Sequence, residues 1–309
     1  MLLDTRPTVS FALVCVLVVI VLGVTTPHLY ASGNLLNLGQ VVSILGVVTV
    51  GQMIVMVGGG LDLSVGATAG LAFFSLASIS HGMNGRIVPA LLATFTMAVV
   101  IGLVNAFLVV QRKIPPFVAT LGTLIVIKGV VNAWSHGVFQ GSIPDGLRGV
   151  TTTHWGPIST ALVVLLVVLL TSGALLGRTS FGQRLYAVGL NEQAAAYAGI
   201  SVGRSRTITY VISSVLAALA GLLLGAYTGF VDPTAGQSLN LESVAAAVVG
   251  GVSLLGGRGR TVNAALGAVL MTLVLNVGLL HGLSGQSQSI MTGIVLLVAA
   301  FLYGVRGRA

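Results

Sequence analysis

The sequence predicts an all-α membrane protein that crosses the bilayer several times. Of its 309 residues, 55% are hydrophobic and only 6% are charged, whereas soluble domains carry about 25% charged residues. The 14 Lys and Arg outnumber the 6 Asp and Glu, for a net charge of +8. These basic residues fall singly or in pairs between apolar runs, so they form no patch for nucleic acid. We therefore expect a polytopic membrane protein with no nucleic-acid partner.

Ten apolar segments are long enough, or nearly so, to cross the hydrocarbon core, which takes about 20 helical residues. The first segment is predicted to be a retained helix and not a cleaved signal peptide, because many further spans follow it. We predict a single transmembrane domain over residues 1–309, with helices at 9–26, 35–57, 65–80, 88–110, 116–134, 157–176, 207–228, 240–256, 261–280 and 288–304.

The basic residues predict which side of the membrane each loop faces, since Lys and Arg collect in cytoplasmic loops. With the N-terminus inside, eleven of the fourteen fall on the inner side. Only Arg86 and Arg148 fall outside, and Lys128 lies within the fifth span. We therefore predict that both termini are cytoplasmic. The eleven are Arg6, Arg112, Lys113, Arg178, Arg184, Arg204, Arg206, Arg258, Arg260, Arg306 and Arg308.

Two Gly-rich stretches depart from the regular alternation of long apolar spans and basic inner loops. Residues 58–66 form an inner turn without a single Lys or Arg, and the segment at 240–257 has only a short apolar run between Glu242 and its closing glycines. Paired Gly-interrupted segments in the two halves of a transporter indicate a substrate path built on broken helices. Such backbone is tolerated only where it is buried in protein or lines a water-filled cavity. We predict broken or re-entrant segments at both places.

The longest inner loop, residues 178–206, is predicted to hold a short cytoplasmic helix. Asn191 is suited to the N-cap, Glu192 to the first turn and Gly199 to the C-terminal end. A helix this short is not stable alone in water, so it must pack against something. From these residues alone, a docking element for a partner and a solvated connector both remain open.

The sequence carries no signature of an enzyme. It has no GxxxxGK[ST] loop for ATP phosphates, no HExxH or GxSxG, and no pair of carboxylates within one span. Its one cysteine, Cys15, and its five scattered histidines offer no metal-ligand spacing. We expect no catalytic residue, metal or cofactor in this chain, and any energy from ATP must come from a partner.

Four motifs carry a family resemblance. Residues 59–66, GGLDLSVG, resemble the GGxDLSVG signature of permease subunits of bacterial ABC importers for simple sugars, the ribose, xylose and galactose type. Residues 114–123 look like that family's IPPFxATLGT stretch, and residues 189–200 are similar to its GxNxxAAxxxGI coupling segment. Residues 245–257 resemble its AAxVxGGxSLxGG stretch. Branched-chain amino acid permeases are distant relatives that lack the Asp-Leu-Ser version of the first motif.

The resemblance implies a multi-pass permease in the bacterial inner or plasma membrane that imports a monosaccharide or sugar-like solute. Its implied partners are a second permease chain, identical or different, an ABC ATPase subunit whose two nucleotide-binding modules bind ATP-Mg, an extracytoplasmic sugar-binding protein, and membrane lipid. The residues implied to couple the permease to the ATPase are Asn191, Glu192, Gln193, Ala194, Ala195 and Gly199.

The alternative that the residues leave open is a secondary transporter driven by an ion gradient, which broken helices also fit. Asp62 and Glu242 are the only carboxylates near span ends that could couple transport to ions.

Polar side chains inside the spans are candidates for the substrate pathway. Asp62 either caps the third span or accepts hydrogen bonds from sugar hydroxyls. Lys128 either extends to the membrane interface or is a buried cation that faces the bundle interior. The full candidate set is Gln52, Asp62, Ser64, Asn105, Thr120, Thr123 and Lys128.

Overall fold

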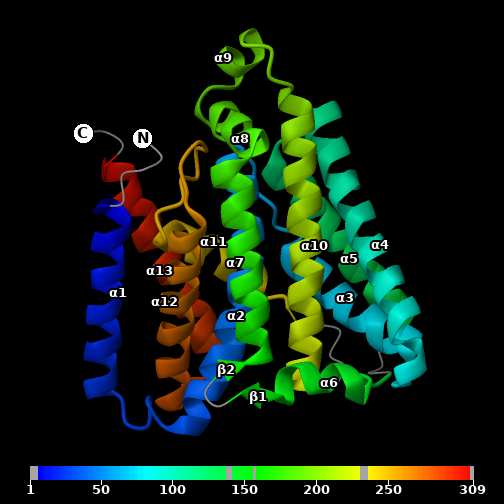
Figure 1. Cartoon of the computed structure of the whole chain (residues 1–309), viewed down its shortest axis with the longest axis vertical. Coiled ribbons are helices and arrows are strands. Elements are labelled where there is room, and N and C mark those ends of the chain that lie inside the picture. Colours follow the sequence, from blue (N-terminus) through cyan, green and yellow to red (C-terminus); the bar gives the residue numbers. More distant parts are fainter. Residues whose placement is uncertain (1–5, 137–140, 156–157, 230–235, 307–309) are drawn as a thin grey trace.

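The computed structural model describes residues 6–136, 141–155, 158–229 and 236–306. Within these ranges the chain is a bundle of α-helices with one small β-ribbon (Figure 1). In the ribbon, β1 (His154–Trp155) pairs antiparallel with β2 (Ile158–Ser159), and Trp155 lies opposite Ile158.

A helix lies over each of the ten predicted segments. In chain order these helices are α1 (Arg6–Thr25), α2 (Ser32–Val57), α3 (Val65–Ser80), α4 (Ile87–Ala106), α5 (Pro116–Ser135), α7 (Thr160–Arg178), α10 (Val202–Thr228), α11 (Leu239–Val249), α12 (Thr261–Leu280) and α13 (Gly285–Arg306). Six helices in the described ranges are long and apolar enough to cross a membrane, and shorter apolar helices accompany them. The prediction of an all-α polytopic membrane protein is confirmed.

Several predicted bounds were wrong. The segment predicted to be helical over 240–256 ends at Val249, because Gly251 adopts a left-handed conformation (φ +79°) that stops the helix. The segment predicted over 88–110 changes after Ala106 into a π-helical turn, η2 (Phe107–Gln111), and is preceded by a 3₁₀ turn, η1 (Asn84–Arg86). Residues 156–157, at the predicted start of the sixth span, lie outside the described residues.

Three short helices lie outside the predicted spans. α9 (Glu192–Tyr197) is the predicted loop helix, whereas α6 (Asp145–Thr152) and α8 (Ser180–Leu190) were not predicted. The loop at 178–206 is thus mostly helical and is not a single helix between connectors.

The core of the bundle is built around α2 and α10. Every residue of α2 from Val42 to Val57 is buried, and α10 packs against α2, α3 and α4. In contrast, α4, α5 and α7 expose large apolar side chains such as Leu92, Ile125 and Leu170. Their outer faces are therefore suited to lipid or to another apolar protein surface.

The short elements lie at opposite ends of the bundle (Figure 1). α8 and α9 lie at the upper end of the view, and the start of α1 and the end of α13 lie on the same side. The ribbon and α6 lie at the lower end. The predicted loop helix is therefore on the same side of the bundle as the first and last helices.

Candidate functional site

The first Gly-rich stretch breaks the chain between α2 and α3. Gly59 adopts a left-handed conformation (φ +77°), and its N–H donates to the carbonyl of Met56 at 2.9 Å, which closes the end of α2. Residues 58–64 then run as non-helical backbone until α3 begins at Val65. Asp62, Ser64 and Val65 are fully buried. The predicted break is confirmed, and it lies inside the protein.

Asp62 organises this break through three hydrogen bonds. Its Oδ1 accepts from the Ser64 N–H at 2.9 Å and from the Ser64 hydroxyl at 2.6 Å, and its Oδ2 accepts from the Ser213 hydroxyl of α10 at 3.0 Å. Asp62 is therefore not the N-cap of α3, because the N-cap position belongs to Ser64. Its carboxylate instead closes a local turn and ties that turn to α10.

Two more candidates join Asp62 and Ser64. The Asn105 side-chain amide of α4 donates to the Ser64 hydroxyl at 2.8 Å. The Thr120 hydroxyl of α5 accepts from the Leu63 N–H at 3.1 Å. Four of the seven pathway candidates, Asp62, Ser64, Asn105 and Thr120, thus meet in one buried network that joins the break to three helices. Ser213 completes it and was not predicted, because a serine in the middle of an apolar helix gives no local signal.

The remaining pathway candidates lie outside this network. The Thr123 hydroxyl donates to the carbonyl of Ala119 in its own helix at 3.1 Å. The Lys128 ammonium, half-buried on α5, donates to the Gln237 side-chain oxygen at 3.0 Å. Gln52 is completely buried in α2, and neither polar atom of its amide has a partner among the described residues.

The second Gly-rich stretch lies directly beside the first. The Gly257 N–H donates to the carbonyl of Val57, the last residue of α2, at 2.9 Å. A Cβ added at Gly256 would lie 3.0 Å from the Cα of Gly59. A further contact joins α3, which follows the first break, to α11, which precedes the second. The Asn240 side-chain oxygen of α11 accepts from the Gly66 N–H of α3 at 2.6 Å. Two stretches separated by almost 200 residues thus form one junction.

α8 packs onto this junction. A Cβ added at Gly189 would lie only 1.9 Å from the Val57 oxygen and 2.5 Å from the Gly257 nitrogen, so α8 touches both breaks at a glycine. The Tyr186 hydroxyl donates to the carbonyl of Gly259 at 2.6 Å. The half-buried Tyr186 phenol has a pKa above its ordinary value of 10, mainly because burial disfavours the charged form. It is therefore protonated at neutral pH and able to donate this hydrogen bond.

α9 has the termini that the sequence predicted. The Asn191 side-chain oxygen accepts from the Ala194 N–H at 2.9 Å, as an N-cap does, and Gly199 beyond the helix is left-handed (φ +77°). Glu192, Gln193 and Ala194 are exposed, whereas Ala195 is buried.

Arg206, which was not among the predicted site residues, joins α9 to the first break. A terminal guanidinium nitrogen of Arg206 lies 2.8 Å from the Glu192 carboxylate. The Nε of the same side chain donates to the carbonyl of Gly58 at 3.1 Å. Four residues further along α10, the Tyr210 hydroxyl lies 3.5 Å from the carbonyl of Leu61. The start of α10 therefore contacts both the loop helix and the backbone of the break.

Comparison with known proteins identifies the family. The model of the family described as "Branched-chain amino acid transport system / permease component" matches residues 34–300. The chain belongs to this family. It is similar to the autoinducer 2 import system permease protein LsrC of Klebsiella pneumoniae, with 34% identity over 294 residues that cover 95% of this chain and 85% of the relative. It is also similar to the ribose import permease protein RbsC of Bacillus subtilis, with 36% identity over 299 residues that cover 93% and 89%. No solved structure gives a significant match.

Membership of this permease family shows which kind of function the site serves. The chain is a membrane permease of an ABC importer of the simple-sugar type, a transport component and not an enzyme. The resemblance expected from the four sequence motifs is confirmed. The buried network and the paired breaks are therefore features of a transport pathway subunit and not of a catalytic centre.

Proposed function

We propose that the chain forms half of an ATP-driven transmembrane pathway that imports a simple sugar or sugar-like solute across the bacterial inner membrane. The observation that carries this proposal is the contact of α8 with both helix breaks, because it links the surface loop at 178–206 to the discontinuous backbone inside the bundle. A second permease chain, identical or different, supplies the other half. An ATPase with two nucleotide-binding modules and an extracytoplasmic binding protein complete the importer.

We further propose that all ten predicted segments cross or enter the membrane, with both termini cytoplasmic. The concentration of basic residues on one side supports this orientation. It is also supported by α8, α9, the start of α1 and the end of α13, which share one side of the bundle (Figure 1).

The solute class is supported by the relatives, whose names assign them to ribose and autoinducer 2 import. Inside the bundle, hydroxyl and amide side chains dominate the candidate pathway, which suits a neutral solute rich in hydroxyl groups. We propose that Gln52, Thr123 and Lys128 also belong to this pathway. Gln52 supports the assignment, because its buried amide has no partner among the described residues. The network of Asp62, Ser64, Asn105 and Thr120 serves the pathway indirectly, by holding the break in shape.

ATP hydrolysis in the partner acts on the pathway through α9 in this proposal. The ATPase binds the exposed surface of α9, built by Asn191, Glu192, Gln193 and Ala194, while Ala195 and Gly199 set its packing and its end. A displacement of α9 reaches the first break through Arg206 and reaches both breaks through α8. As a result, the pathway changes the side of the membrane to which it is open, and this chain itself catalyses no reaction.

Reconstitution tests the proposed function. Proteoliposomes that contain the permease, the ATPase and the binding protein from the same genetic neighbourhood are expected to accumulate D-ribose, D-xylose or D-galactose only when ATP is supplied to the ATPase. Uptake that persists without the ATPase and collapses with an ion gradient would contradict the proposal and establish a secondary transporter. Uptake of none of these sugars would contradict the solute class.

Arg206→Lys is expected to uncouple ATP hydrolysis from transport. Lysine keeps the positive charge, but its single ammonium nitrogen cannot replace two separate guanidinium nitrogens, one at the Glu192 carboxylate and the other at the Gly58 carbonyl. Because Glu192 is 55% exposed, the ion pair adds little stability, so the variant should fold normally. We expect solute-stimulated ATP hydrolysis to fall about tenfold with little change in thermal stability.

Arg204→Lys is the matched control, because Arg204 lies on the same turn of α10 and is exposed. Solute should stimulate ATP hydrolysis in this control as strongly as in the unmodified chain. If solute stimulates ATP hydrolysis just as strongly in the Arg206→Lys variant, the proposed route from α9 to the first break is excluded.

A further inference from the structure

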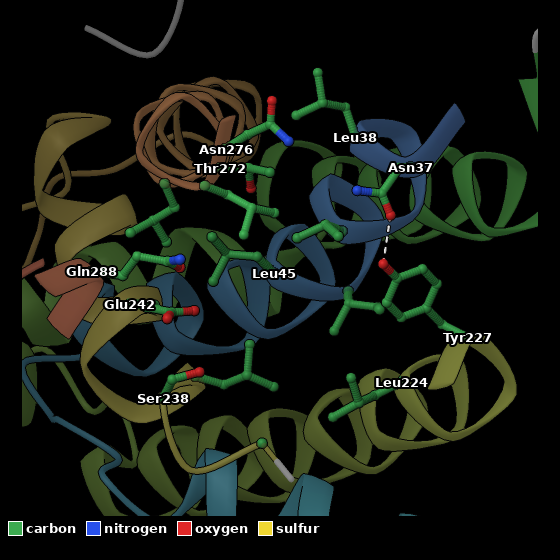
Figure 2. A pocket seen from close by; sticks show the side chains of 16 residues that line it. Asn37, Leu38, Leu45, Leu224, Tyr227, Ser238, Glu242, Thr272, Asn276 and Gln288 are labelled. Carbon is green, nitrogen blue, oxygen red and sulfur yellow. Dashed lines mark hydrogen bonds between the residues drawn. The ribbon is translucent and has the colours of Figure 1, made fainter. Parts of the chain in front are cut away.

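A cavity that several polar side chains line lies away from the two helix breaks. It has a volume of about 280 Å³ and lies between α2, α10, α11, α12 and α13 (Figure 2). Asn37 near the start of α2, Tyr227 at the end of α10 and Gln288 near the start of α13 lie on its wall. These are the helix ends opposite to α8 and α9, so the cavity belongs to the other side of the bundle.

One polar atom in this cavity lacks a partner. The Thr272 side chain lines the cavity and is only 2% exposed, yet its hydroxyl has no hydrogen-bond partner among the described residues. A buried hydroxyl without a partner is costly, which favours a ligand or water that can bind to it. Figure 2 shows the Glu242 carboxylate directed into the same space, with Gln288 beside it. The Ser238 side chain lines the same part of the cavity.

The opposite wall presents a further donor. The Tyr227 hydroxyl donates to the Asn37 side-chain oxygen at 2.5 Å (Figure 2). This bond occupies the oxygen of the Asn37 amide and fixes its orientation, so its NH₂ group remains available to donate. The cavity therefore offers amide donors, a hydroxyl that can donate or accept, and a carboxylate that accepts.

This mixture selects the class of ligand. An ammonium or metal cation binds through acceptor atoms, and the Asn37 NH₂ group cannot serve it, because the Asn37 oxygen accepts from Tyr227 and the NH₂ group is left facing the ligand. A sugar hydroxyl both donates and accepts, so it matches every group on the wall. The leucine side chains between the polar groups, Leu45 and Leu224 among them, suit the apolar faces of a sugar ring. The volume lies just below the usual range of about 300–1,000 Å³ for ligand pockets, which suits one small solute.

We propose that this cavity is a binding site for a single monosaccharide within each permease chain, held by Glu242, Thr272 and Asn37, with Gln288 at its edge. This inference rests on the proposed function, since it takes the transported solute as the ligand. It places a solute site inside one chain, whereas the pathway itself needs two chains.

Cysteine protection tests the site. The only native cysteine, Cys15, is removed by Cys15→Ser, and Gln288→Cys places a thiol on the cavity wall. Ser289→Cys is the matched control, because Ser289 is the next residue and is exposed outside the cavity wall. The permease is labelled in nanodiscs with a polar maleimide, with D-ribose, D-xylose, D-galactose or ethanolamine present at millimolar concentration.

At least one sugar is expected to slow labelling of the Gln288→Cys variant severalfold and to leave the Ser289→Cys variant unchanged. Adding Thr272→Val or Glu242→Gln should weaken this protection about tenfold in apparent sugar affinity. Thr272→Val removes a hydroxyl, and Glu242→Gln replaces one acceptor oxygen of the carboxylate by an NH₂ donor. Thr171→Val on the exposed face of α7 should not change it.

Three outcomes overturn the inference. Protection by ethanolamine and by no sugar would make the cavity a cation site. Protection that survives both Thr272→Val and Glu242→Gln would show that the sugar binds at another place. Absence of protection by a sugar that the same protein transports with ATP would exclude this site and leave the proposed function intact. Protection without any ATP-driven uptake would instead contradict the proposed function and support the site.

Discussion

Gly189→Ala is expected to abolish ATP-driven transport, although it adds a single methyl group. The new Cβ would lie 1.9 Å from the Val57 oxygen and 2.5 Å from the Gly257 nitrogen, which are themselves hydrogen bonded to each other. Neither backbone atom can turn aside as a side chain could, so α8 must withdraw or the bond between the two breaks must open. Overpacking of this kind costs about 1–3 kcal/mol. We expect uptake to fall at least tenfold.

Gly177→Ala provides the control for this variant. Gly177 lies in α7, near the same end of the bundle, and a Cβ there would meet nothing within 4 Å. Its uptake and melting temperature in detergent should match those of the unmodified chain or slightly exceed them, because alanine favours a helix. If both alanine variants transport equally well, close contact between α8 and the breaks is not needed for transport.

Asp62→Ala is expected to have the second large effect, through the loss of structure and not of a solute contact. It would leave the Ser64 N–H, the Ser64 hydroxyl and the Ser213 hydroxyl without their acceptor in a fully buried place. Each stranded donor costs about 1–3 kcal/mol. We expect a clearly lower melting temperature in detergent and uptake reduced more than tenfold. Asp62→Asn keeps one acceptor oxygen, so its melting temperature and uptake should lie between those of Asp62→Ala and those of the unmodified chain.

Asp145→Ala is the comparison for Asp62, since Asp145 is exposed at the start of α6. It should change neither stability nor uptake. A stable Asp62→Ala protein that fails to transport would instead support direct contact between the Asp62 carboxylate and the solute. An unchanged melting temperature together with full uptake would exclude both roles.

The fold class could be predicted because lipid imposes strong constraints on sequence. Long apolar segments and the start of α3 at Val65 follow from local composition, and so does α9, whose N-cap and terminal glycine are local signals. The interruption after α11 was predicted from its glycines, but its position at Val249 was not. The left-handed Gly251 ends the helix. The contact of the following backbone with the first break, at the carbonyl of Val57, has no local signal in the sequence.

The candidate site was predictable only in part, for a related reason. Asp62, Ser64, Asn105 and Thr120 stand out as polar residues in apolar surroundings, and the structure brings them together. Their partner Ser213 and the bridging Arg206 gain their importance from contacts about 150 residues away along the chain. Residue type alone assigns Arg206 to a cytoplasmic charge cluster and does not reveal its hydrogen bond to Gly58.

The burial of α2 from Val42 to Val57 constrains how the protein is made. α2 is among the first helices to be synthesised, yet its burial depends on α10 and α12, which follow more than 100 residues later. Until they arrive, the buried Gln52 amide must face lipid or a protein of the insertion machinery, because polar side chains are costly in hydrocarbon. Assembly of this permease is therefore completed late, and a chain truncated before α10 would leave the Gln52 side chain uncovered in an otherwise apolar helix, a feature suited to recognition by membrane quality control.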